Sequence, residues 1–356
     1  MIDFRYHLVS IVAVFLALAI GIVIGATQLK PATDSILDNQ SRTEKQQIDS
    51  LRAQNRSLQS QLGSAQQFAQ ASAPDLLAGR LSGQRVVLVT APGSDSAIVT
   101  GISTALAQAG AKVTGQVALQ PAFFDTSAQN ESSLDDLAQR LTPAGFIPVA
   151  PTSQLASDTK IGAQNEAAQV IAAALVTSAG QVAGQPAQDS TDLPAAEAEQ
   201  ILNGFSKQGI LQASPASGTT AMEPATLAVV VIPSAPPQAG DTDPANLALI
   251  SVAYQLRMAS RGVVVAGPLS GSGPGSAIDE LINGNTGVQV SSVDNADSEQ
   301  GQVVVAEALA MLLTGQRPVA YGVGTGAVPT PGPDPTSTAT PTPTPSKTSS
   351  KRKSGG

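Results

Sequence analysis

The stretch LVSIVAVFLALAIGIVIGA at residues 8–26 contains nineteen residues with no charge and no proline. As a helix rising about 1.5 Å per residue it would be about 28 Å long, close to the roughly 30 Å hydrocarbon layer of a membrane. A helix also satisfies its own backbone hydrogen bonds in lipid. We therefore predict a membrane-spanning helix. A cleaved secretory signal is the alternative, but the run is long for one, and Ile24 lies where cleavage after Ala26 would need a small residue.

The orientation of this helix is weakly encoded by charge. Residues 1–7 form a short lead-in with Arg5, while Lys30 and Arg42 follow the span, so the two sides are nearly balanced. The short lead-in and the Ser-, Thr- and Pro-rich end of the chain favour a single-pass protein of the cell membrane. Its N-terminus would be cytoplasmic and its bulk extracytoplasmic. His7, the single histidine, is expected at the membrane interface and is not assigned as a metal ligand.

Small residues recur every four positions within the predicted span, at Ala17, Gly21 and Gly25. This spacing places them on one face of a helix, where a second helix can approach closely. They form a candidate face for dimerisation in the membrane. The alternative is that glycine is simply common in membrane helices.

A helical stalk is predicted over residues 34–72, which are rich in Gln, Ser, Arg and Leu. With Ile48 at position a of a heptad, the a and d positions form a coiled-coil seam. An asparagine at one a position favours a parallel two-stranded coil, so we expect a parallel homodimer. The alternative is a helix packed on its own globular domain, and Pro74 is expected to end the stalk. The predicted seam consists of Ile48, Leu51, Asn55, Leu58 and Leu62, followed by Ala65.

Short Val-rich runs alternate with Ala-rich helical stretches in residues 83–324, which indicates an α/β domain facing the envelope. Apolar runs separated by helices are typical of a parallel sheet covered on both faces. We predict a Rossmann-like domain of three layers with right-handed crossovers. The predicted strands are 85–90, 112–119, 227–233, 262–266 and 288–293, and the predicted helices are 96–109, 132–141, 165–177, 195–204, 244–260 and 302–313.

The end of the chain, residues 327–356, is rich in Pro, Thr and Ser and is predicted to be an extended, disordered tail. Glycosylation or a reach into the cell wall would suit this composition. Its terminal Lys351, Arg352 and Lys353 would contact anionic polymers or remain solvated.

Composition excludes several classes of function. The formal net charge of −8 at pH 7 argues against nucleic-acid binding, which needs a basic face. The 356 residues include no cysteine, so disulfides and thiolate metal sites are absent from the chain. With one membrane-proximal histidine, a Ser-His-Asp triad is excluded from the folded domain. We predict a protein that is not an enzyme, with no catalytic and no cofactor-binding residues.

Two glycine-bearing loops follow predicted strands, APGSD at residues 91–95 and GPLSGSGPG at 267–275. Neither matches GxGxxG or GxxxxGK, so nucleotide binding is not expected, although any ligand or partner of a doubly wound domain would lie at this carboxyl edge. The run VDNAD at 293–297 follows another strand. Its carboxylates are expected to cap the next helix, with a hard cation as the alternative.

The segment FRYHLVSIVAVFLALAIGIVIG at residues 4–25 resembles the opening of the actinobacterial MctB family, described as copper transport outer membrane proteins. The resemblance extends through SSVDNAD at 291–297 and YGVG at 321–324. It implies copper efflux or homeostasis at the envelope, with the outer membrane as an alternative location. A SteB-like branch implies instead a structural or regulatory coiled-coil protein that binds an envelope-growth or cell-division partner without binding copper.

Copper is implied by the family name alone, and no metal ligand can be assigned. Cu(I) prefers thiolate or thioether ligands, and imidazole suits Cu(II). The chain has no cysteine, and Met222, Met258 and Met311 are scattered at positions expected to fill the core. The strands are apolar throughout, unlike the alternating strands of an outer-membrane barrel.

Overall fold

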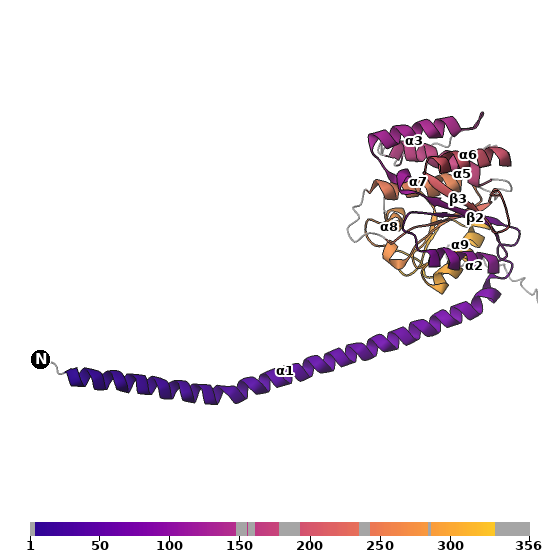
Figure 1. The fold of residues 1–356 in the computed structure, drawn as a ribbon. Coiled ribbons are helices and arrows are strands. Elements are labelled where there is room, and N and C mark those ends of the chain that lie inside the picture. Colours follow the sequence, from indigo (N-terminus) through magenta and orange to yellow (C-terminus); the bar gives the residue numbers. More distant parts are fainter. Residues whose placement is uncertain are drawn as a thin grey trace, which may run out of the picture. The chain divides into compact units, whose positions relative to one another are not determined.

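The computed structural model describes residues 4–146, 155, 161–177, 193–234, 243–283 and 286–331 (Figure 1). For residues 4, 5 and 26–43 the description covers the helical backbone alone. The chain divides into two units, Met1–Gln67 and Phe68–Gly356. The predicted tail beyond Pro331 lies outside the described residues. The predicted domain bounds at 8–26, 34–72, 83–324 and 327–356 stay predictions.

Helix α1 (Phe4–Leu77) supplies all the described residues of the first unit and the first ten residues of the second. Its segment Tyr6–Gly25 is the one helix in the described part of the chain that is long and apolar enough to cross a membrane, and none of it is buried. This segment coincides with the predicted span within two residues at its start. An N-terminal apolar helix is thus present.

The second unit contains a sheet of seven strands, as far as the described residues go. Its order is β3-β2-β1-β4-β5-β6-β7, with every neighbouring pair parallel except β2 and β3. The predicted parallel sheet is therefore present except at one edge, where β3 is antiparallel. The strands are β1 (Arg85–Thr90), β2 (Lys112–Leu119), β3 (Leu211–Pro215), β4 (Leu227–Val231), β5 (Val263–Ala266), β6 (Ser291–Val293) and β7 (Ala320–Tyr321).

Most predicted elements are present, and the errors concern short or half-exposed segments. The predicted strand 288–293 forms only over its last three residues. Three short elements, β3, β7 and α8, were not predicted from the sequence. The helices are α2 (Ser96–Gln108), α3 (Ala128–Leu141), α5 (Gly162–Leu175), α6 (Ala195–Lys207), α7 (Pro244–Ala259), α8 (Ala277–Ile282) and α9 (Glu299–Leu313), with 3₁₀ turns η1 (Pro121–Phe124) and η3 (Leu269–Gly271).

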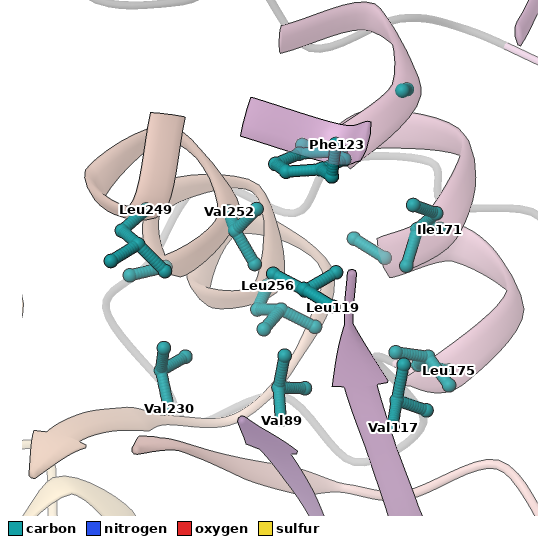
Figure 2. Close-up of a cluster of buried hydrophobic side chains, with 14 of the residues drawn as sticks. Val89, Val117, Leu119, Phe123, Ile171, Leu175, Val230, Leu249, Val252 and Leu256 are labelled. Atoms are coloured by element: carbon teal, nitrogen blue, oxygen red, sulfur yellow. The ribbon is translucent and has the colours of Figure 1, made fainter. Parts of the chain in front are cut away.

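Helices cover both faces of the sheet. Helices α3, α5, α6 and α7 lie on one side, and α2 and α9 on the other (Figure 1). Alternate residues of β1 pack on opposite faces of the sheet, because successive side chains of a strand point in opposite directions. Val87 and Val89 join the first core, in which Phe123 and α7 residues also pack (Figure 2), whereas Val86 and Leu88 join the second. Burial from both sides explains why these strands are apolar throughout.

The last turn of α1 packs onto the second core. Ala73 and Leu77 are buried there with Leu81, and the helix continues three residues beyond Pro74. The prediction that Pro74 ends the helix was wrong, because proline removes one backbone donor while the burial of Leu77 favours one more turn. Just after α1, Arg80 forms a bidentate pair with Glu307 of α9, with Nε 3.0 Å from Oε1. Its hydrogen bonds to Glu307 raise the pKa of Arg80.

Candidate functional site at the carboxyl edge of the sheet

Two sequence blocks that lie far apart in the chain meet at the carboxyl ends of β6 and β7. Asp294 follows β6 directly and is 1% exposed. Its Oδ1 accepts the backbone N–H of Val323 at 2.8 Å, and its Oδ2 accepts that of Gly324 at 2.8 Å. We call this arrangement of Asp294 with residues 322–324 the Asp294 clasp. It joins the blocks SSVDNAD and YGVG.

The two clasp positions after β7, 322 and 324, require glycine. Gly322 has a φ of +136°, and a Cβ at position 322 or 324 would collide with the Asp294 carboxylate. The backbone N–H of Asp294 also donates to Tyr321 O at 3.2 Å, which continues the pairing of β6 and β7. Tyr321 is buried, and desolvation raises the pKa of its hydroxyl. The clasp therefore pairs both oxygens of a buried carboxyl group with two backbone donors.

The clasp corrects the sequence interpretation of VDNAD. The N-cap of α9 is Ser298, whose Oγ accepts the N–H of Gly301 at 3.1 Å, so neither aspartate caps that helix. Asp294 holds the turn after β7, and Asp297 is exposed. The partners of Asp294 lie 29 and 30 residues further along the chain. No local sequence signal reveals such a contact.

Apolar side chains are exposed beside the clasp. Val323 is 65% exposed, and Leu269 in the loop after β5 is 47% exposed. The two loops are close, because a Cβ on Gly324 would lie 3.3 Å from Ser272 Oγ, which itself donates to Leu269 O at 2.8 Å.

The order of the parallel strands reverses between β1 and β4, and the described residues of the loops after these strands lie at this point. Helices α2 and α7 follow these strands onto opposite faces, so a crevice for a ligand would be expected between them. Ser94 Oγ instead donates to Val231 O at 2.9 Å, and Pro233 lies against Gly93 and Gly271. Among the described residues, Ser94 and Pro233 thus occupy part of the space between these loops.

Carboxylates cap the two helices that begin at this point. Asp95 accepts the N–H of Ala97 at 2.8 Å at the start of α2, and Asp243 accepts that of Ala245 at 2.9 Å at the start of α7. A helix N-terminus attracts phosphate when its donors are free, but here an anion already occupies each.

Metal ligands are not gathered in the described part of the chain. No group of three or more His, Cys, Asp or Glu among those residues is placed to hold a metal ion. Met222 packs against the first core, and Met258 and Met311 are half-buried in α7 and α9. His7 is exposed on α1. These four side chains lie on different segments of the described structure.

The predicted interaction residues of α1 lie on exposed helix surface. A Cβ added at Gly21 or Gly25 would meet no atom of the chain within 4 Å, and Ala17 on the same face is also exposed. The large apolar residues of the predicted seam are 47–63% exposed, although side chains at a and d positions of a coiled coil pack against a partner helix. These exposed seam residues are Ile48, Leu51, Leu58 and Leu62, and Asn55 between them is exposed as well.

A small cavity of about 200 Å³ lies at the opposite, amino edge of the sheet. Its lining includes Arg85, Thr177, Leu193 and Pro224. Arg85 Nε donates to Pro224 O at 2.6 Å, so part of the guanidinium is already engaged.

Comparison with known proteins identifies the family. Residues 1–331 match the family model described as "Copper transport outer membrane protein, MctB". The chain is 26% identical over 329 residues to the "Copper transporter MctB" of Mycobacterium tuberculosis, covering 91% of this chain and 97% of that protein. It is 28% identical over 326 residues to the protein of the same name from Mycobacterium leprae, with the same two coverages. The match includes the apolar helix, the sheet and the clasp, and the chain belongs to the MctB family.

Proposed function

We propose that this chain is a membrane-anchored envelope protein of copper transport or copper homeostasis. The observation that carries the proposal is the family match over residues 1–331, which spans both units of the chain. The relatives at 26% and 28% identity are named copper transporters. The alternative, a structural or regulatory protein of envelope growth or cell division without a role in copper, is not favoured by these names.

The described residues contribute to copper transport as an anchored scaffold and do not themselves carry the metal. This part of the proposal is supported by residue chemistry, because the chain has no cysteine and one histidine. Soft Cu(I) needs thiolate or thioether ligands, and the methionines are spread through the packed domain. A further envelope protein would then hold the ion. The chain is accordingly proposed not to be an enzyme.

The anchor is proposed to be a single-pass helix of the cell membrane, with its N-terminus in the cytoplasm and the α/β domain outside. The apolar segment Tyr6–Gly25 supports a span, and the α/β domain, which presents no second such helix among its described residues, suits an aqueous compartment. Location in the outer membrane, as the family description words it, is the alternative.

The stalk is proposed to be a parallel, two-stranded coiled coil of two copies of this chain. Its support is the heptad spacing together with the 47–63% exposure of the large apolar seam residues, which a single chain leaves in water. The stripe of Ala17, Gly21 and Gly25 would let the two membrane helices approach. The α/β domain is proposed to be Rossmann-like, because its central strands share that doubly wound order apart from the antiparallel β3.

A deletion strain tests the proposed function. We expect loss of the chain to raise copper sensitivity and cell-associated copper, and the full-length chain to restore both. A chain without residues 8–26 should fail to restore them because it is not anchored. Unchanged copper tolerance and copper content in the deletion strain would reject the role in copper homeostasis.

Calorimetry with Cu(I) tests the scaffold part separately. The full-length chain in detergent is expected to release no heat of stoichiometric binding. A saturable signal with about one ion per chain would show that the chain binds copper itself. This result would contradict the scaffold part of the proposal and leave the role in copper homeostasis intact.

A further inference from the structure

We infer that one face of the last turns of α1, residues 68–77, contacts a second copy of this chain, while another face packs against the chain's own domain. The inference rests on the proposed coiled-coil dimer and extends its seam. It assigns Leu76, which lies beyond the predicted stalk, to the interface between the two copies.

Two faces of this helix segment differ in burial. Ala73 and Leu77 are 5% and 0% exposed because they pack in the second core. Leu76 is 59% exposed and Phe68 is 72% exposed, although both are large apolar side chains. At 100° per residue, Leu76 lies about 80° around the helix from the middle of the buried face. The domain therefore leaves this side of the helix open.

The exposed side follows the heptad register of the stalk. Leu76 comes fourteen residues after Leu62 in the sequence, which is two whole heptads, and so falls on position a. Ala69 at a and Ser72 at d lie between them. Both are small side chains, which leave room for a partner helix. The register thus continues to the last turn of α1 without an insertion or a deletion.

The surroundings of the seam favour a second copy over another kind of partner. In a parallel two-stranded coil each core position faces its own equivalent, so Leu76 would meet Leu76 and Asn55 would meet Asn55. Flanking e and g positions usually select partners by charge, and like charges there disfavour identical chains. Between residues 54 and 66 they are all neutral glutamines, at Gln54, Gln59, Gln61 and Gln66. The charged exceptions on either side are Lys45, Arg52 and Asp75.

A consequence concerns the end of the seam. Leu77, buried in its own domain, is the immediate neighbour of Leu76 at the seam. The proposed seam would therefore reach the residue next to the one that enters the second core.

Single-cysteine crosslinking tests this arrangement, because the natural chain contains no cysteine. We would introduce Leu76→Cys, Leu58→Cys and Gln67→Cys singly into the full-length chain in detergent and oxidise each. Leu58→Cys reports the stalk seam, whereas Gln67→Cys lies at an outer f position. Facing a or d positions bring the Cα atoms within the roughly 4.4–6.8 Å that a disulfide needs. We expect Leu76→Cys and Leu58→Cys to crosslink at least about tenfold faster than Gln67→Cys.

The outcomes separate the inference from the proposal on which it rests. Crosslinking by Leu58→Cys without Leu76→Cys would overturn the extended seam and leave the coiled coil intact. Failure of both would reject the coiled coil itself. Equal rates at all three positions would indicate random collision and overturn both.

Sedimentation of full-length variants adds a measurement without oxidation. Leu76→Glu places two like charges face to face and is expected to raise the dimer dissociation constant at least about tenfold. Leu269→Glu is the matched control, because Leu269 is also an exposed leucine but lies at the carboxyl edge of the sheet. An unchanged dissociation constant for Leu76→Glu would contradict the inference.

Discussion

The apolar run at the start of α1 and the apolar strands of the sheet have similar compositions and opposite environments. Phe15 in α1 is 66% exposed and Leu16 is 61% exposed, whereas Val87 in β1 and Val229 in β4 are fully buried. The strands are covered by helices of the same chain on both faces. In the first unit, by contrast, the large apolar side chains described on α1 are exposed.

The same contrast recurs along α1 itself. Leu62 is 63% exposed, and Leu77 is fully buried in the second core. An exposed leucine of this kind costs little in the isolated chain but provides binding energy once a partner covers it, roughly 1.5–3 kcal/mol when fully buried. The second unit is therefore folded around its own core, whereas the exposed leucines of the first unit agree with the proposed association of two copies.

The largest effect is expected in the first core. Phe123→Ala should destabilise the α/β domain by about 3–5 kcal/mol, because Phe123 is fully buried and the substitution leaves a cavity (Figure 2). Urea unfolding of the full-length chain, followed by the circular dichroism of its tyrosines, would measure this. Leu58→Ala on α1 is the matched comparison and should leave the unfolding midpoint of the domain unchanged. Equal losses of stability in the two variants would contradict the distinction between the packed domain and the exposed helix.

The Asp294 clasp should give the next largest effect. Asp294→Asn keeps the shape but replaces one acceptor by an amide donor that faces a backbone N–H of residue 323 or 324. We expect a loss of about 1–3 kcal/mol, the usual cost of leaving a buried polar group without a partner. The same urea experiment applies, with the exposed Asp297→Asn as control. If both variants lost the same stability, overall charge and not the clasp would be responsible.

The pair between Arg80 and Glu307 should contribute less. Arg80→Met removes both hydrogen bonds and is expected to cost about 1 kcal/mol, the upper end for partly exposed ion pairs, because the geometry is bidentate. Arg80→Lys keeps the charge without the bidentate contact and should lose less. The effect should shrink in high salt, and a loss independent of salt would point to packing of the arginine stem instead.

The smallest effect concerns Glu166 on α5, and it depends on pH. Burial first, and then a hydrogen bond with Asp135 and repulsion from its charge, raise the pKa of Glu166. Ionisation is therefore harder in the folded state, and the stability present at acidic pH falls as pH rises through the folded pKa. Glu166→Gln should make the chain slightly more stable than the natural one at neutral pH and equally stable in acid. Thermal unfolding at both pH values tests this, and a loss of stability at neutral pH would contradict the prediction.

The sequence predicted those elements of the domain whose signal is local. Strands β1 and β2 were predicted with their observed bounds, and α2 and α7 within one residue, because Val-rich runs and caps such as Asp95 act within a few residues. Strand β3 was missed because LQASP is short, half polar and ends in proline, which suits an edge. Strand β7 has two residues and no recognisable pattern.

The candidate site was predicted less well, for a physical reason. The motifs SSVDNAD and YGVG were recognised as parts of the family resemblance, but their contact through Asp294 was not expected. The direction of a buried carboxylate depends on which donors the fold brings to it. Those donors come from a strand pairing that the local sequence does not encode.

By itself, the sequence determined the apolar helix, the heptad spacing of the stalk and the alternation of strands and helices, since each follows from the chemistry and spacing of near neighbours. The tertiary structure alone decided the strand order, the antiparallel β3, the Asp294 clasp, and the burial of Leu77 beside an exposed Leu76. These features depend on contacts between residues far apart in the chain, whose free energies arise only when the whole domain has assembled.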